Sequence, residues 1–196
     1  MPVKIIYPDH VEIVGLGHVL LTAPHTASPD ADLHTGTIVE EAALTSRSYA
    51  VIGKVSREFL DLNRIQSAQS EFRKSIEGFI AEDGIRYLLD IRGKKEPGVN
   101  IGTAAGKTCS DSTTELVKSR LSKDFTVKVN SENMGDEPGI IVTSYNRKDA
   151  KDNFVVETIQ VEFGHEERQF QREKVISDIS EIADILDAQL VTSRGD

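Results

Sequence analysis

Short runs of β-branched and apolar residues alternate with longer segments of helical apolar spacing along the 196 residues of this chain. Such runs predict strands where turn-forming residues bound them, and an apolar residue at every third or fourth position predicts a helix. The first two runs are separated by Pro8-Asp9-His10 and predict a hairpin. The predicted strands are residues 3–7, 11–15, 17–25, 49–52, 85–91, 125–129 and 154–163.

Four helices are expected between and after these strands. Ser110 or Asp111 is suited to cap one of them, and Thr35 or a residue near it is suited to cap another. The second helix ends naturally at Asp83-Gly84. The predicted helices are residues 35–44, 66–82, 110–121 and 172–190.

The remaining segments carry weaker patterns. Residues 98–109 are expected to form a glycine-rich loop, 140–142 a short strand or buried turn, and 145–151 a short helix. The alternation of strands and helices predicts an α/β fold: a three-layer sandwich with a mixed, largely parallel sheet. The chain length predicts a single domain over residues 1–196.

Charge and composition argue against several classes of partner for this protein. The net charge of −9 argues against nucleic acid as a partner, because binding to the phosphate backbone needs a basic surface. No apolar run approaches the roughly 20 residues of a membrane span, and no signal-peptide pattern is present, so cytoplasmic localisation without a membrane partner is expected. The single cysteine, Cys109, excludes an internal disulfide. The exposed face of the C-terminal helix is the surface that a homodimer would use.

Three predicted strands end with residues capable of chemistry: His25, then Asp90 with Arg92, then Glu162 with His165. Ligands bind beyond the carboxyl ends of parallel strands, where these side chains would meet. A divalent metal needs two or three aimed nitrogen or oxygen ligands, and a nearby carboxylate can activate its water. His25 is the natural first ligand. The candidates for a second ligand follow it in the next loop and helix: Asp30, Asp32, His34 and Glu40.

The segment Gly102-Thr-Ala-Ala-Gly106-Lys107-Thr108 resembles a phosphate-binding loop, but it has three residues before the Gly-Lys pair where that loop has four. Residues 97–100 also do not look like the buried strand that such a loop follows. A nucleotide site is therefore not expected.

Several motifs in order along residues 20–170 resemble the N-formylglutamate amidohydrolase family. They are Pro24-His25, Thr35-Gly36-Thr37, Arg57 with Asp61-Leu62-Asn63-Arg64, Asp90-Ile91-Arg92-Gly93, the run Val99 to Gly106, Asn130, and Gln160-Val161-Glu162. The resemblance implies a phosphorylase/hydrolase-like fold related to zinc carboxypeptidases. It implies a divalent metal, zinc, that polarises an amide carbonyl, a glutamate that shuttles the proton, and arginines that hold the substrate carboxylate.

On matching positions, the resemblance implies that Glu162 is the general acid/base and that Arg57 or Arg64 clamps the carboxylate. Arg64 has an equally good structural interpretation as an ion-pair partner of Asp61. The expected catalytic residues are Glu162 and Arg92, and the expected substrate-binding residues are Arg57, Asn63, Arg64 and Asn130. The candidate metal ligands are His25, His34, Glu40, Asp90 and His165.

One departure from the family pattern changes this picture. Arg92 stands where the family tends to have a histidine, and a guanidinium stays protonated and cannot bind a metal. Three outcomes follow: His34, Asp90 or His165 substitutes as ligand, the metal is bound weakly, or the site is metal-free and binds an anion through Arg92.

The sequence thus predicts a metal-dependent hydrolase of an amide bond in a small carboxylate-bearing substrate, such as an N-acyl amino acid, with Glu162 as base. The alternative is a non-catalytic anion-binding or regulatory relative on the same scaffold, in which Arg92 replaces a metal ligand. Glu162 itself has a plainer interpretation, as a strand carboxylate that faces solvent or pairs with arginine.

Overall fold

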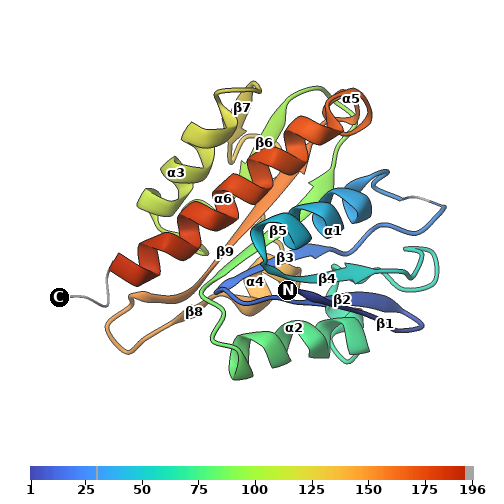
Figure 1. Ribbon diagram of the computed structural model, residues 1–196, viewed down its shortest axis with the longest axis horizontal. Helices are drawn as coiled ribbons and strands as arrows, with labels where there is room; N and C mark the ends of the chain where they lie inside the picture. Colours follow the sequence, from blue (N-terminus) through green and yellow to red (C-terminus); the bar gives the residue numbers. More distant parts are fainter. Residues whose placement is uncertain (30, 193–196) are drawn as a thin grey trace.

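The computed structural model describes residues 1–29 and 31–192, and in this part of the chain nine strands form a continuous sheet (Figure 1). The strand order is β1-β2-β4-β3-β5-β9-β6-β7, and β8 pairs with β9 beside this path. The strands are β1 (Val3–Ile6), β2 (His10–Val14), β3 (Val19–Ala23), β4 (Tyr49–Gly53), β5 (Tyr87–Gly93), β6 (Val99–Gly102), β7 (Val127–Val129), β8 (Arg147–Lys148) and β9 (Phe154–Phe163).

The centre of the sheet is parallel. Strand β3 pairs in parallel with β4 and β5, and β5 pairs in parallel with β9, so four neighbouring strands end at the same edge. Parallel neighbours need crossover connections, and helices supply them here. The predicted hairpin β1–β2 joins β4 antiparallel, and β6 joins β9 antiparallel, which makes the sheet mixed. The predicted α/β fold with a largely parallel sheet is confirmed.

Helices cover both faces of the sheet (Figure 1). Helices α1, α3 and α6 pack on one face in the larger core cluster, and α2 and α4 pack on the other. Central strands are buried on both sides in this arrangement, which explains their continuous apolar runs. The helices are α1 (Thr35–Ser46), α2 (Glu71–Glu82), α3 (Asp111–Leu121), α4 (Ile141–Tyr145), α5 (His165–Phe170) and α6 (Arg172–Thr192), with a 3₁₀ turn at Ile65–Ser67.

The helix starts agree only partly with the predicted caps. Ser110 caps α3 as expected, since its side chain accepts a hydrogen bond from the backbone N–H of Thr113. The N-cap of α1 is His34, which has a left-handed backbone and makes no side-chain cap. Thr35 is the first helical residue, and its hydroxyl donates to the carbonyl of Asp32.

Four short segments differ from the sequence-based expectation. Val99–Gly102, expected as loop, is the buried strand β6, and residues 140–142 lead into helix α4. Residues 145–151 contain strand β8 rather than a helix, and helix α5 was not predicted. Each of these elements has six residues or fewer, too few for apolar periodicity to show. Helix α2 also begins later than expected, at Glu71, after a Ser70 cap.

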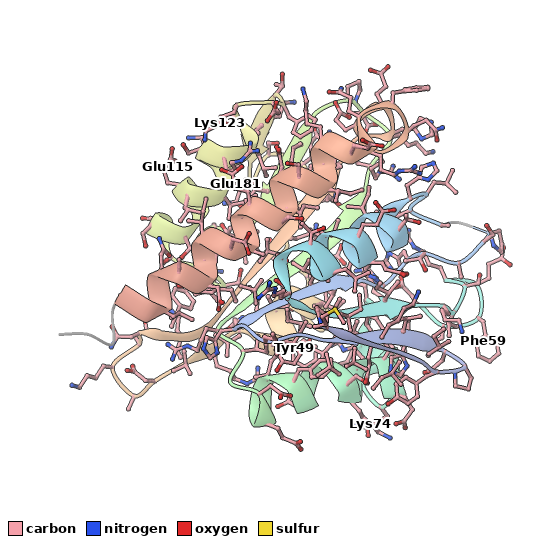
Figure 2. The ribbon with its side chains drawn as sticks, in the orientation of Figure 1. Tyr49, Phe59, Lys74, Glu115, Lys123 and Glu181 are labelled. Carbon is pink, nitrogen blue, oxygen red and sulfur yellow. The ribbon has the colours of Figure 1, made fainter. Side chains whose placement is uncertain are left out.

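The loop between β4 and α2 leaves the same edge of the sheet as the loop after β3. Phe59 in this loop extends outward at the rim of the molecule (Figure 2), whereas Leu62 is buried in the smaller core cluster. Leu62 therefore anchors the segment that carries Asp61, Asn63 and Arg64 near the strand ends. Among the helices of the described residues, none combines the length and apolar character needed to cross a membrane.

The central strand β5 offers a test of the core. Leu89 is 1% exposed, whereas Leu44 on α1 is 42% exposed. We expect Leu89→Ala to lower the free energy of unfolding by about 2 to 5 kcal/mol through lost burial and a cavity. Leu44→Ala, the matched control, should change it by less than about 0.5 kcal/mol. Urea unfolding followed by circular dichroism measures both, and equal losses would contradict the assigned core.

Candidate functional site

The predicted strand ends do lie side by side. Strand β3 leads to His25, and its neighbour β5 carries Asp90 and Arg92. On the other side of β5, Glu162 of β9 lies directly opposite Arg92 in the parallel register. Because side chains alternate along a strand, register partners point to the same side, so Arg92 and Glu162 share one face of the sheet.

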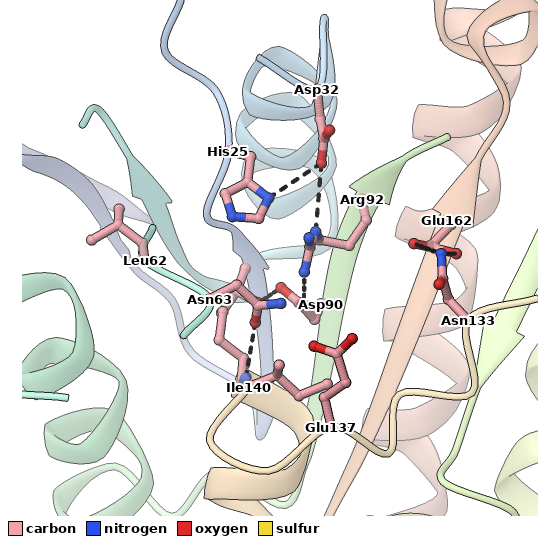
Figure 3. A network of polar contacts seen from close by, with 12 residues as sticks. His25, Asp32, Leu62, Asn63, Asp90, Arg92, Asn133, Glu137, Ile140 and Glu162 are labelled. Carbon is pink, nitrogen blue, oxygen red and sulfur yellow. Dashed lines mark hydrogen bonds and ion pairs between the residues drawn. The ribbon is translucent and has the colours of Figure 1, made fainter. Parts of the chain in front are cut away.

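A buried carboxylate, Asp32, faces both His25 and Arg92 at this edge (Figure 3). Its Oδ1 accepts a hydrogen bond from Arg57 Nη2 at 2.7 Å, and its Oδ2 lies 3.5 Å from Arg92 Nε. The His25 Nδ1 atom is 3.6 Å from the same Oδ2, a distance too long for a normal hydrogen bond. Burial alone would raise the pKa of Asp32, but the His25 ring and the two guanidiniums outweigh it and lower the pKa to about 2.

His25 is held between two carboxylates. Its Nε2 is 2.6 Å from Asp61 Oδ1, and the ring is almost fully buried. Burial opposes ionisation of Asp61, yet the His25 ring lowers the pKa of that carboxyl well below its usual range. Arg64 Nε approaches the other oxygen of Asp61 at 3.7 Å, so the predicted Asp61–Arg64 pair is present. Arg64 also pairs with Glu137.

Asp90 is fully buried below Arg92. Its Oδ1 accepts a hydrogen bond from Thr22 Oγ1 at 2.7 Å, and its Oδ2 lies 3.5 Å from Arg92 Nη1. Burial raises the pKa of Asp90, although Arg92 and Thr22 act in the opposite direction. Arg92 is thus suspended between Asp32 and Asp90.

Glu162 is 4% exposed and is held by amide groups. Both of its oxygens accept from Asn133 Nδ2, at 2.9 and 3.0 Å, and Asn100 Nδ2 lies 3.4 Å away. Burial raises the pKa of Glu162, and the Asn133 hydrogen bond and the Arg92 charge oppose the rise. The interpretation of Glu162 as a solvent-facing carboxylate is therefore wrong, because the side chain is buried.

Glycine lets the loop that carries Asn133 approach the sheet. A Cβ on Gly102 would lie 2.8 Å from the Asn133 carbonyl oxygen and 2.9 Å from Met134 C. Asn130, a predicted substrate-binding residue, accepts hydrogen bonds from the backbone and hydroxyl of Thr103. These contacts place Asn130 in the packing of this loop against β6.

A cavity of about 290 Å³ opens over this edge. Predicted substrate-binding residues Asn63 and Arg64 line it together with Arg92 and Glu162. Asn63 is buried, and its Oδ1 accepts the backbone N–H of Ile141, which fixes it at the cavity floor. The other lining residues are Glu132, Asn133, Met134, Gly135, Asp136, Glu137, Ile140 and Gln160.

The other candidate ligands are engaged elsewhere. His34 Nε2 lies 2.6 Å from Gln169 Oε1, and Glu40 pairs with Lys4 on the surface. His165 is exposed at the start of α5 and lines a separate groove. Asp30 lies outside the described residues. Among residues 1–29 and 31–192, no group of three or more His, Cys, Asp or Glu side chains could hold a metal ion.

The donor set around Asp32 does not fit a divalent metal. His25 Nδ1 is buried without a hydrogen-bond partner and faces Asp32, as two ligands of a metal would. The third side chain at this point is the Arg92 guanidinium, which offers no lone pair and brings a positive charge. This arrangement favours the metal-free outcome among the three that the Arg92 departure allows.

Sequence reasoning missed two residues that shape the site. Asp61 holds His25, and Asn133 holds Glu162. Asp61 had a visible signal, because it falls in the family-like segment before Asn63. No sequence pattern pointed to Asn133, because it comes close to Glu162 only in the folded conformation of its loop.

No protein-family model matches this chain, and no curated protein sequence matches it. Among solved structures, N-formylglutamate amidohydrolase from Ralstonia eutropha JMP134 is similar, with a TM-score of 0.72, 12% identity and coverage of 95% of this chain and 100% of that chain. A bacteriophage poly-gamma-glutamate hydrolase has a TM-score of 0.62 at 12% identity, covering 96% and 92%. A metallo-carboxypeptidase from Burkholderia cenocepacia has a TM-score of 0.53 at 12% identity, covering 93% and 61%. The predicted resemblance is confirmed as a shared fold.

The network around Asp32 makes stability depend on pH. A carboxyl whose pKa is lower in the folded state stabilises the fold above its unfolded pKa and loses that contribution as pH falls. We expect Asp32→Asn to lower the free energy of unfolding by about 2 kcal/mol at pH 7, and the difference from wild type to vanish between about pH 4 and pH 2. Urea unfolding across this pH range measures it.

The exposed Asp136 at the cavity rim provides the control. Asp136→Asn should leave the free energy of unfolding within about 0.5 kcal/mol of wild type at each pH. A difference between wild type and Asp32→Asn that does not change with pH would contradict the assigned ion pairs.

Proposed function

We propose that this protein hydrolyses an amide bond in a small carboxylate-bearing substrate, with Glu162 as general base and Arg92 as the group that stabilises the oxyanion. One observation carries the proposal: Arg92 and Glu162 lie opposite each other on neighbouring strands and open into one cavity. The fold shared with an amidohydrolase and a peptidase supports the reaction class.

Glu162 has the environment of a general base. Burial raises its pKa, which makes the carboxylate a better proton acceptor, and Asn133 fixes its orientation. In the proposed reaction Glu162 takes a proton from water as the water oxygen bonds to the amide carbon. The same proton then passes to the nitrogen as the carbon–nitrogen bond breaks.

Arg92 supplies the positive charge in this mechanism. Charge develops on the carbonyl oxygen in the transition state, and a fixed N–H donor in a partly buried site stabilises it. The long 3.5 Å contacts to Asp32 and Asp90 hold the guanidinium in place while leaving donor capacity. No step uses a metal, because the residues around Asp32 do not fit one.

In this proposal Asn63 and Arg64, which both line the cavity, orient the substrate. Arg64 is the guanidinium with the more exposed side chain and can bind a carboxylate in a bidentate way, in exchange for its contact with Glu137.

A second function is favoured by a specific observation. The Arg92 guanidinium is already paired with Asp32 and Asp90, and a charge so engaged also suits a non-catalytic protein that binds an N-acyl amino acid without cleaving it. Such a protein would bind the same ligands with no turnover.

The base is tested directly by Glu162→Gln. Against a panel of N-formyl and N-acetyl amino acids, we expect kcat to fall by about 10²- to 10⁴-fold, because the amide cannot accept the proton. The exposed Glu166 just beyond the strand provides the matched control, and Glu166→Gln should keep wild-type kcat. Activity that survives Glu162→Gln contradicts the mechanism. Saturable binding without turnover in wild type selects the non-catalytic alternative.

The metal question is tested by Arg92→His. We expect calorimetry to detect no stoichiometric Zn²⁺ binding by wild type and stoichiometric binding by Arg92→His, since an imidazole joins His25 and Asp32. Arg92→Gln removes the charge without adding a ligand and should not gain this affinity. Stoichiometric zinc in the wild-type protein would show that the guanidinium does not exclude the metal.

A further inference from the structure

A groove of about 460 Å³ lies on the other side of Asp32 from the cavity with Glu162. We call it the basic groove, because four cationic side chains and one carboxylate are among the described residues that line it. This charge contrasts with the net charge of −9 for the whole chain. The lining residues are Ala31, Asp32, Leu33, Arg57, Gly93, Lys94, Lys95, His165 and Arg168.

Arg168 is the most unusual of these cations. It is 5% exposed, and its guanidinium donates to the backbone carbonyls of Phe163, Leu33 and Lys94. None of the carboxylates in the described part of the chain forms an ion pair with it. Burial lowers the pKa of Arg168, although the charges of Asp32 and Glu167 act in the opposite direction. The hydrogen bonds of this buried cation go only to neutral carbonyls, and an anion bound nearby would further offset the cost of its burial.

The backbone is built to admit this guanidinium. A Cβ on Gly93 would lie 2.6 Å from Arg168 Cζ and 2.7 Å from its Nη1. Only a glycine therefore allows the guanidinium to lie against the end of strand β5. The residue after Arg92 in the family-like segment thus serves the basic groove.

The groove also holds unused donors. Arg57 donates a hydrogen bond from Nη2 to Asp32, but its Nε is buried without an acceptor. Lys95 is exposed, and no carboxylate in residues 1–29 or 31–192 forms an ion pair with it. His165, which is exposed, adds an imidazole to the lining of the groove.

Two ion pairs separate the groove from the cavity: Asp32 with Arg92, and Lys94 with Glu132. The cavity itself is lined by two guanidiniums and four carboxylates, so its charge is less favourable to a free anion than that of the groove. An anionic group near this edge is therefore favoured in the groove.

We propose that the basic groove binds an oxyanion, a carboxylate or phosphate group, against Arg57, Lys95 and Arg168. The proposal does not depend on the hydrolase activity. The oxyanion has two conceivable sources, an acidic group of the substrate that occupies the cavity or a separate small anion.

The test uses the full chain at low ionic strength, with inorganic phosphate and succinate as probes in titration calorimetry. We expect saturable binding to wild type and on the order of tenfold weaker binding to Lys95→Glu, since the exposed charge is reversed. Lys95→Arg should retain the affinity. The matched control is Lys123→Glu, at an exposed lysine beyond the end of α3 (Figure 2), which should bind as wild type does.

Two results would overturn the proposal. One is the absence of saturable binding of both probes at concentrations up to on the order of 10 mM. The other is an equal loss in Lys95→Glu and Lys123→Glu, which would indicate attraction by overall charge alone. Competition then separates the two sources: an N-acyl amino acid that displaces phosphate identifies a substrate group, and simultaneous binding of both identifies a separate anion.

Discussion

The carboxylate of Asp32 is the interaction on which this edge of the molecule depends. It draws together the guanidiniums of Arg57 and Arg92, which come from the loop after β4 and from strand β5. Its own loop is tied to the end of β3 by the hydrogen bond from Asp32 N to the carbonyl of His25. Three separate segments are thus joined through one side chain, and its low pKa shows that the attraction exceeds the cost of burial.

Arg92 gives this carboxylate a different role from the one it would have beside a metal. A divalent ion would bring two positive charges and open coordination positions, whereas a guanidinium brings one charge and directed N–H donors. In the proposed reaction, the chemistry of the site therefore rests on hydrogen bonding and on proton transfer. Glu162, held by Asn133, is the residue suited to the second of these.

The sequence was informative wherever a pattern was long. The strands around Leu89 and Ile159 and the helix 172–190 were predicted because continuous apolar runs and helical spacing reflect burial between layers. Strand β6 and helices α4 and α5 were missed or wrongly assigned, since elements of four to six residues are decided by tertiary packing.

The residues of the candidate site could also be predicted only in part. The convergence of His25, Arg92 and Glu162 could be predicted, because parallel strands end at one edge. The joint metal role of His34, Glu40 and His165 could not be judged from spacing alone, since helix and loop paths take them to other contacts. The role of Asn133 could not be predicted from the sequence, because its loop reaches Glu162 only by folding back over Gly102.

The two ion pairs in the wall between cavity and groove make the two hollows electrostatically dependent on each other. Arg92 and Glu132 line the cavity, while their partners Asp32 and Lys94 line the groove. A ligand that draws Arg92 away from Asp32 leaves that carboxylate with Arg57 as its remaining guanidinium partner, and the added negative character would weaken the binding of an anion in the groove. By thermodynamic linkage the same free energy acts in the reverse direction. In the proposed binding scheme, occupancy of one hollow therefore changes the affinity of the other through these shared ion pairs.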